Sequence, residues 1–165
     1  MPLIILHGWS DHAASFHPLA KRLAAALPHQ PLHCINLADY ISLADQVTYD
    51  DLAAALQRAW LHLGLPTTAH SVDAIVHSTG ALVLRHWLVQ HYAAEQAPIG
   101  QLLMLAPANF GSPLAHKGRA FIGRLFKGLG HGRPFEVGEN LLRGLELASP
   151  YTWWLAEQDL FVDQA

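Results

Sequence analysis

Residues 74–83 read AIVHSTGALV, and this stretch decides the fold. A stretch typical of a strand, Val72 to Val76, leads into residues 77–80, and apolar residues at helical spacing follow directly. A serine placed where a buried strand turns into a helix sits on a strained turn, with its hydroxyl exposed near the positive end of the helix. Gly80 supplies the small residue needed where strand and helix backbones approach closely. The stretch therefore predicts a strand–turn–helix unit with Ser78 as a nucleophile, and the plainer alternative makes Ser78 an ordinary helix N-cap.

The strand-then-helix order repeats along the chain. Stretches typical of strands cover residues 2–7, 32–37, 72–76 and 99–106, and helical spacing covers residues 16–27, 48–63 and the residues after 80. This alternation predicts an α/β fold with a mostly parallel sheet of four to five strands and helices on both faces. A length of 165 residues suits one domain, 1–165, with a βα core at 1–107. Because the alternation stops there, we expect a helical region resembling a lid or cap at 108–165.

Local signals fix several helix ends and faces. Thr48 and Asp51 form an acidic capping box, and Ser149 with Pro150 marks the start of a last helix. On the helix after Ser78, the spacing places Val83, Leu84, Trp87 and Leu88 inward and Arg85, His86, Gln90 and His91 outward. Trp153 and Trp154 are adjacent, so they cannot both face one way, and we expect them in core or cap packing.

Composition excludes several classes of protein. The chain is 52% apolar, and its longest apolar runs are shorter than the ~20 residues of a membrane span, so we expect a soluble protein. The start lacks the features of a secretory signal, which makes the cytoplasm the expected location. Cys34 is the only cysteine, so no internal disulfide forms. Twelve scattered histidines and a net charge of −3 predict neither a metal site nor a nucleic-acid partner.

A second feature follows the first predicted strand. Residues 7–9 are His7, Gly8 and Trp9, and Gly8 lets the chain turn away without a side chain. Backbone N–H groups after such a strand point at the same oxyanion as those near Ser78, because the carboxyl ends of neighbouring parallel strands share one edge. Trp9 N–H and Thr79 N–H are the predicted donors, and simple turn chemistry is the alternative.

The sequence resembles the α/β-hydrolase family, in particular its small bacterial esterases and lipases. The resemblance lies in residues 4–9 (IILHGW), 74–83 and 105–113 (LAPANFGSP), and it covers most of residues 3–115. It implies that Ser78 is the nucleophile, that Trp9 and Thr79 form the oxyanion hole, and that His7, Gly8, His77 and Gly80 support them. It also implies hydrolysis of carboxylic esters, including lipid esters, through an acyl-enzyme and without a cofactor. Val76 departs from the family pattern, which has glycine two positions before the nucleophile.

The catalytic acid and histidine are not identifiable in this sequence. In the resembling family both follow the nucleophile, on loops after later strands. The histidines after Ser78 are His86, His91, His116 and His131, and the late acids are Asp159 and Asp163. We assign none of them, and we expect a chain that is C-terminally truncated with respect to the family. Two alternatives stay open: a catalytically incomplete fragment or binding domain with the same fold, and an acyltransferase, which uses the same residues.

Two further expectations concern surfaces. Residues 117–133 hold five of the ten basic residues with apolar residues between them, which fits either a lid that meets a lipid interface or an ordinary surface helix. The edge of the sheet after the fourth strand is expected to promote association. A nucleotide-binding domain is disfavoured, because residues 8–15 contain no second glycine.

Overall fold

A four-stranded parallel sheet forms the centre of the molecule in the computed structural model, which describes residues 1–8, 16–41, 46–113, 115 and 139–160. The strands are β1 (Leu3–Leu6), β2 (Leu32–Ile35), β3 (Val72–His77) and β4 (Ile99–Leu105), in the order β2-β1-β3-β4. Leu6 is aligned with Ile35 on one side and Val76 on the other, so β1 and β3 end together. The predicted parallel α/β sheet is confirmed.

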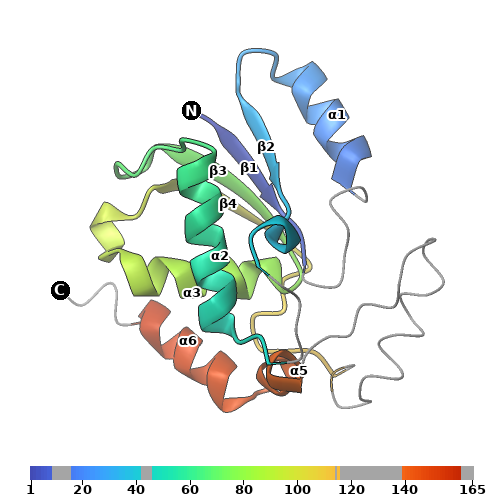
Figure 1. Ribbon diagram of the computed structural model, residues 1–165, viewed down its shortest axis with the longest axis vertical. Coiled ribbons are helices and arrows are strands. Elements are labelled where there is room, and N and C mark those ends of the chain that lie inside the picture. Colours follow the sequence, from blue (N-terminus) through green and yellow to red (C-terminus); the bar gives the residue numbers. More distant parts are fainter. Residues whose placement is uncertain (9–15, 42–45, 114, 116–138, 161–165) are drawn as a thin grey trace.

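The helices flank the sheet as the sequence pattern predicts. They are α1 (His17–Ala26), α2 (Tyr49–His62), α3 (Gly80–His91), α5 (Glu139–Leu145) and α6 (Pro150–Leu160), with short 3-10 turns η2 (Leu37–Asp39) and η3 (Ala94–Gln96). Figure 1 shows α2 and α3 together over the sheet, with α6 beside α3 and α1 apart from them. The sequence did not predict α5, whose seven residues are too few for a clear periodic pattern.

Alternation along β1 divides the core into two layers. Ile4 and Leu6 belong to the large cluster that packs against α2 and α3, whereas Leu3 and Ile5 belong to a smaller cluster against α1. This follows from the period of two in a strand, because successive side chains point to opposite faces. None of the residues of α1 is fully buried, although Leu3 and Ile5 of the strand that it covers are. At the open edge, Leu103 of β4 is 54% exposed.

The burial of α3 corrects one expectation. Arg85 and His86, expected to face outward, are buried at 7% and 5% exposure, whereas Gln90 and His91 are exposed as expected. The reason is tertiary: α6 packs against α3 and covers the face that helical periodicity within α3 alone marks as polar. Neither Trp153, 59% exposed, nor Trp154, 38% exposed, is buried in the core, but Trp154 packs against the buried His86 with ring centroids 5.3 Å apart.

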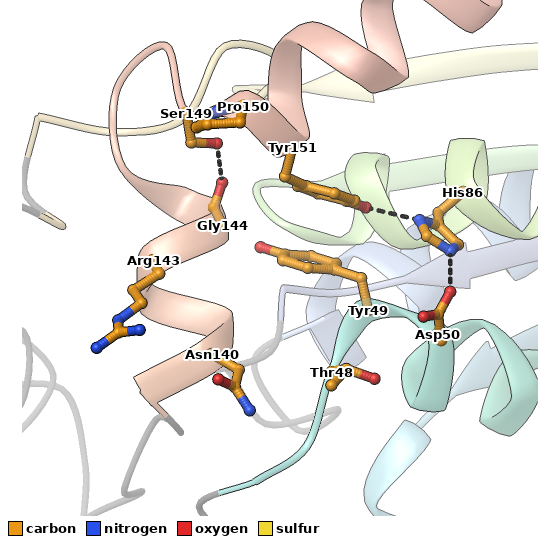
Figure 2. A pocket seen from close by; sticks show the side chains of 10 residues that line it. All are labelled: Thr48, Tyr49, Asp50, His86, Asn140, Arg143, Gly144, Ser149, Pro150 and Tyr151. Atoms are coloured by element: carbon orange, nitrogen blue, oxygen red, sulfur yellow. Dashed lines mark hydrogen bonds and ion pairs between the residues drawn. The ribbon is translucent and has the colours of Figure 1, made fainter.

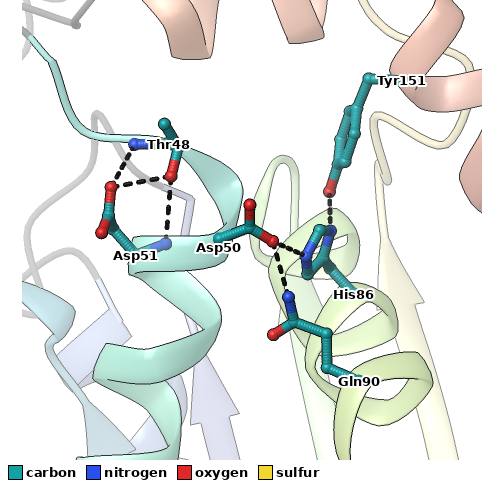
Figure 3. Close-up of polar contacts among 6 residues, drawn as sticks. All are labelled: Thr48, Asp50, Asp51, His86, Gln90 and Tyr151. Carbon is teal, nitrogen blue, oxygen red and sulfur yellow. Dashed lines mark hydrogen bonds and ion pairs between the residues drawn. The ribbon is translucent and has the colours of Figure 1, made fainter.

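The capping signals are confirmed (Figure 3). Thr48 Oγ1 accepts a hydrogen bond from the backbone N–H of Asp51 at 3.2 Å, and Thr48 N–H donates to Asp51 Oδ2 at 2.9 Å. Ser149 Oγ likewise accepts from Thr152 N–H at 3.2 Å at the start of α6. These bonds satisfy N–H groups that have no partner inside the helix. Hydrogen bonding by Thr48 lowers the pKa of the Asp51 carboxyl below its ordinary value.

Candidate active site

Ser78 lies in a left-handed backbone conformation between β3 and α3. Its φ is +54°, which is uncommon for a residue other than glycine. The backbone holds this conformation from two sides: Ser78 N–H donates to Leu105 O at 3.1 Å, and Ser78 O accepts from Ala108 N–H at 3.2 Å. The last residue of β4 and the segment that follows β4 therefore hold the turn at Ser78 in place. A strained turn maintained in this way is a common property of functional sites.

The end of β1 packs directly on this turn. A Cβ built on Gly80 would lie 2.7 Å from Leu6 O and 2.9 Å from His7 O, so only glycine fits there. A Cβ on Gly8 would lie 3.1 Å from Ser78 Cβ and 3.4 Å from Ser78 Oγ. The glycines expected from the sequence therefore let the loop after β1 and the turn at Ser78 meet. Thr79, the N-cap of α3, is buried at this junction.

His77 directly precedes Ser78, and His7 directly precedes Gly8, which packs on Ser78. The imidazoles of both histidines contact other residues. Nδ1 of His7 is 2.8 Å from Gly8 O, and because a carbonyl only accepts, this nitrogen carries the proton. Both imidazoles contact Phe16, with ring centroids 6.3 Å away for His7 and 5.4 Å for His77. His7 Nε2 and His77 Nδ1 are buried without a hydrogen-bond partner among the described residues. Trp9 lies outside the described residues.

His86 is unsuited to activate Ser78, because both of its ring nitrogens are engaged (Figure 3). Its Nε2–H donates to Asp50 Oδ1 at 2.8 Å, which leaves Nδ1 to accept from the Tyr151 hydroxyl at 3.1 Å. Gln90 Nε2 also donates to Asp50 Oδ1, at 2.6 Å. Burial raises the pKa of Tyr151, and the neighbouring Tyr49 adds to this effect, so the hydroxyl keeps the proton it donates.

Asp159, the one of the two late acids that the structure describes, is paired with Arg85 and not with a histidine. Arg85 Nε donates to Asp159 Oδ2 at 2.8 Å, Arg85 Nη2 contacts the same oxygen, and Arg85 Nη1 donates to Asn109 Oδ1 at 3.2 Å. The buried guanidinium thus joins α3, α6 and the segment after β4. His116, His131 and Asp163 lie outside the described residues, as does the stretch 117–133. Within the described ranges, the Ser78 hydroxyl has no histidine as hydrogen-bond partner.

A shallow pocket of about 410 Å³ lies between α2, α3, α5 and α6 (Figure 2). Its lining includes His86, Asn140, Arg143 and the stacked pair Tyr49–Tyr151, whose ring centroids are 4.1 Å apart, but not Ser78. Its charged and polar groups are paired with protein groups: Asp50 with His86, Arg143 with Glu139, and Asn140 with Gln46 O. We therefore interpret it as part of the junction that attaches α5 and α6.

Neither a metal site nor a membrane span is found in the part of the chain that the structure describes. No three His, Cys, Asp or Glu side chains in these ranges are grouped closely enough to hold a metal ion. None of the described helices combines the length and the apolar character required to cross a membrane.

The parallel sheet, the strained serine between β3 and α3, and the glycine contacts with β1 together define a partial α/β-hydrolase fold. Two hydrolases are among the known proteins that are similar to the chain. The pimeloyl-[acyl-carrier protein] methyl ester esterase of Xanthomonas campestris pv. campestris is 34% identical over 109 residues, which are 63% of this chain and 36% of the esterase. Phospholipase PlaB from Legionella pneumophila is 31% identical and superposes with a TM-score of 0.78 over 96% of this chain and 35% of PlaB. No protein-family model matches the chain.

A second structure of PlaB, in complex with thio-NAD, gives a TM-score of 0.75. The chain spans about a third of the length of both relatives. One relative is an esterase and the other a phospholipase, so both similar proteins are ester hydrolases. The resemblance to α/β-hydrolases stated from residues 4–9, 74–83 and 105–113 is confirmed.

Proposed function

We propose that this chain carries the nucleophile and oxyanion loops of a serine hydrolase that acts on carboxylic esters, including lipid esters. The observation that supports this most is the left-handed backbone conformation of Ser78. Hydrogen bonds to Leu105 and Ala108 hold this conformation, and Gly8 packs against it. An ordinary N-cap needs neither the strained φ nor the glycine contact, since N-cap residues adopt extended backbone. The esterase and phospholipase relatives support the choice of an ester substrate.

The proposed reaction begins with attack of Ser78 Oγ on the ester carbonyl carbon. The carbonyl oxygen becomes an oxyanion, which backbone N–H groups of Trp9 and Thr79 stabilise. A histidine takes the serine proton and returns it to the leaving alcohol, and water then releases the acid from the acyl-enzyme. His86 does not fill this role because Asp50 and Tyr151 occupy both its nitrogens. We assign the histidine and the acid to segments other than the described residues.

A fluorophosphonate probe tests the proposal, because it forms a stable phosphonyl ester only with an activated serine. We expect one adduct per molecule by intact mass, absent in Ser78→Ala. An adduct that persists in Ser78→Ala would refute the assignment of the nucleophile. No adduct on a protein shown to be folded would favour the second candidate, a catalytically incomplete binding domain of the same fold.

The second candidate has one specific observation in its favour: within the described ranges, no histidine is bonded to Ser78 Oγ. An acyltransferase would give the same fluorophosphonate adduct as a hydrolase. The two differ in which nucleophile enters second, so adding a primary alcohol to the ester assay separates them. A hydrolase releases mainly the free acid, whereas an acyltransferase forms mainly the new ester.

A further inference from the structure

The segment after β4 holds the backbone of Ser78. Ala108 N–H donates to Ser78 O at 3.2 Å, and Gly111 N–H closes a turn onto Ala108 O at 2.8 Å. A left-handed serine is a strained conformation, and it persists only where the surrounding contacts enforce it. Loosening the segment at Ala108 therefore lets the turn at Ser78 relax, which moves the serine hydroxyl.

Arg85 binds this segment at the residue after Ala108. Its Nη1 donates to Asn109 Oδ1 at 3.2 Å, while its Nε donates to Asp159 Oδ2 of α6 at 2.8 Å. The planar guanidinium fork donates toward two elements at once, which a single ammonium group does not reproduce. Arg85 lies on α3, about two helical turns after Ser78. One side chain thus joins the helix that follows Ser78 to the segment that binds Ser78 O.

The burial of Arg85 strengthens this link. Its side chain is 8% exposed, whereas that of Asp159 is 47% exposed. A buried cation must find protein acceptors for its N–H groups, and hydrogen bonds from a charged donor are stronger than those between neutral groups. Asp159 balances the charge from a partly exposed position, and Asn109 is the acceptor in the segment that holds Ser78.

We propose that Arg85 is a positioning residue for the nucleophile: through Asn109 it fixes the segment at Ala108, and thereby the backbone of Ser78. This inference rests on the proposed function for the role of Ser78. The plainer role of Arg85 is to attach α6 through Asp159. That role uses different N–H groups of the guanidinium, so substitution of Asn109 separates the two roles.

The test is amide hydrogen exchange of Ala108, followed by NMR, in the protein and in Asn109→Ala. This variant removes the acceptor of Arg85 Nη1 and leaves the pair with Asp159 in place. We expect Ala108 N–H to exchange about tenfold faster or more in the variant. The amide of Leu56, in the buried core of α2, should exchange at the original rate, because the opening is local and not global.

Asn109→Asp identifies the partner through which Asn109 acts. Aspartate keeps an oxygen acceptor for Arg85 Nη1 but lacks the Nδ2 group that contacts Met104 Sδ at 3.6 Å. We therefore expect Asn109→Asp to keep the slow exchange of Ala108. Asn140→Ala is the matched control, because it removes a hydrogen bond to Gln46 O on α5 and should leave the exchange of Ala108 unchanged.

Fluorophosphonate labelling connects this effect to the reaction. Asn109→Ala should label Ser78 about tenfold or more slowly, Asn109→Asp should label faster than Asn109→Ala, and Asn140→Ala should label as the unaltered protein does.

Unchanged exchange of Ala108 in Asn109→Ala would overturn the proposal. So would fast exchange in Asn109→Asp, which would point to the Met104 contact, or fast exchange in Asn109→Ala with labelling at the original rate. If the unaltered protein forms no adduct but the exchange of Ala108 follows the prediction, the proposed function fails for this chain and the positioning of the Ser78 backbone by Arg85 stands.

Discussion

Replacing Gly80 by alanine tests the contact between the end of β1 and the serine turn. The new Cβ would lie 2.7 Å from Leu6 O and 2.9 Å from His7 O, and both atoms are backbone. Ordinary carbon–oxygen contacts begin at about 3.3 Å, so the two segments must separate by about 0.6 Å. Over-packing of this size typically costs about 1–3 kcal/mol. Alanine recovers about 1 kcal/mol over glycine through helix propensity, which leaves a net loss of up to about 2 kcal/mol.

Urea unfolding measures this loss, and Gly64→Ala serves as the comparison. Gly64 has φ +62° and nothing within 4 Å of a built Cβ, so its substitution costs backbone strain alone. We expect both variants to be destabilised, but only Gly80→Ala to slow fluorophosphonate labelling of Ser78, because only this variant displaces the loop after β1. A Gly80→Ala protein as stable as the original, labelled at the original rate, would refute the inferred close contact.

Four other substitutions test contacts elsewhere in the structure. Thr48→Ala should lower the free energy of unfolding by about 1 kcal/mol in urea titrations, since it removes the cap of α2. Because the native pKa of Asp51 is lowered, its contribution is present at neutral pH and declines as pH falls through the acidic range; Asp51→Asn should flatten that decline, and an unchanged acid profile would contradict the capping box. Burial raises the pKa of Tyr49 and Tyr151, so stability should fall as pH rises above about 10, less so in Tyr151→Phe, as followed by circular dichroism. Leu103→Lys, on the exposed edge strand β4, should reduce self-association in sedimentation velocity, whereas equal association of both proteins would exclude this edge as the contact.

The sequence predicted the features that depend on short segments. The turn at Ser78 and its need for Gly80 could be predicted from residues 74–83 alone, because strand, turn and helix follow one another there. The capping box of Thr48 and Asp51 is equally local. The meeting of Gly8 with Ser78 spans seventy residues, and it was accessible only because parallel strands bring their carboxyl ends to one edge.

Features that depend on distant packing could not be predicted in the same way. Arg85 and His86 have the polarity of surface residues, and their burial follows from partners on α6, at Asp159 and Tyr151. No pattern within α3 contains that information, since the partners lie 65 or more residues later in the chain. The contact between Phe110 and Trp153 could not be predicted for the same reason, because the two residues lie on segments far apart in the sequence.

Trapping of the acyl-enzyme tests the central claim most directly. The protein is mixed with a p-nitrophenyl ester, quenched in acid within the first turnover and digested, and the acylated residue is located by mass spectrometry. The account predicts an acyl group on the peptide that contains Ser78, bonded to its Oγ and absent in Ser78→Ala. Acylation of any other residue, or release of p-nitrophenol with no acyl group on Ser78, would contradict it.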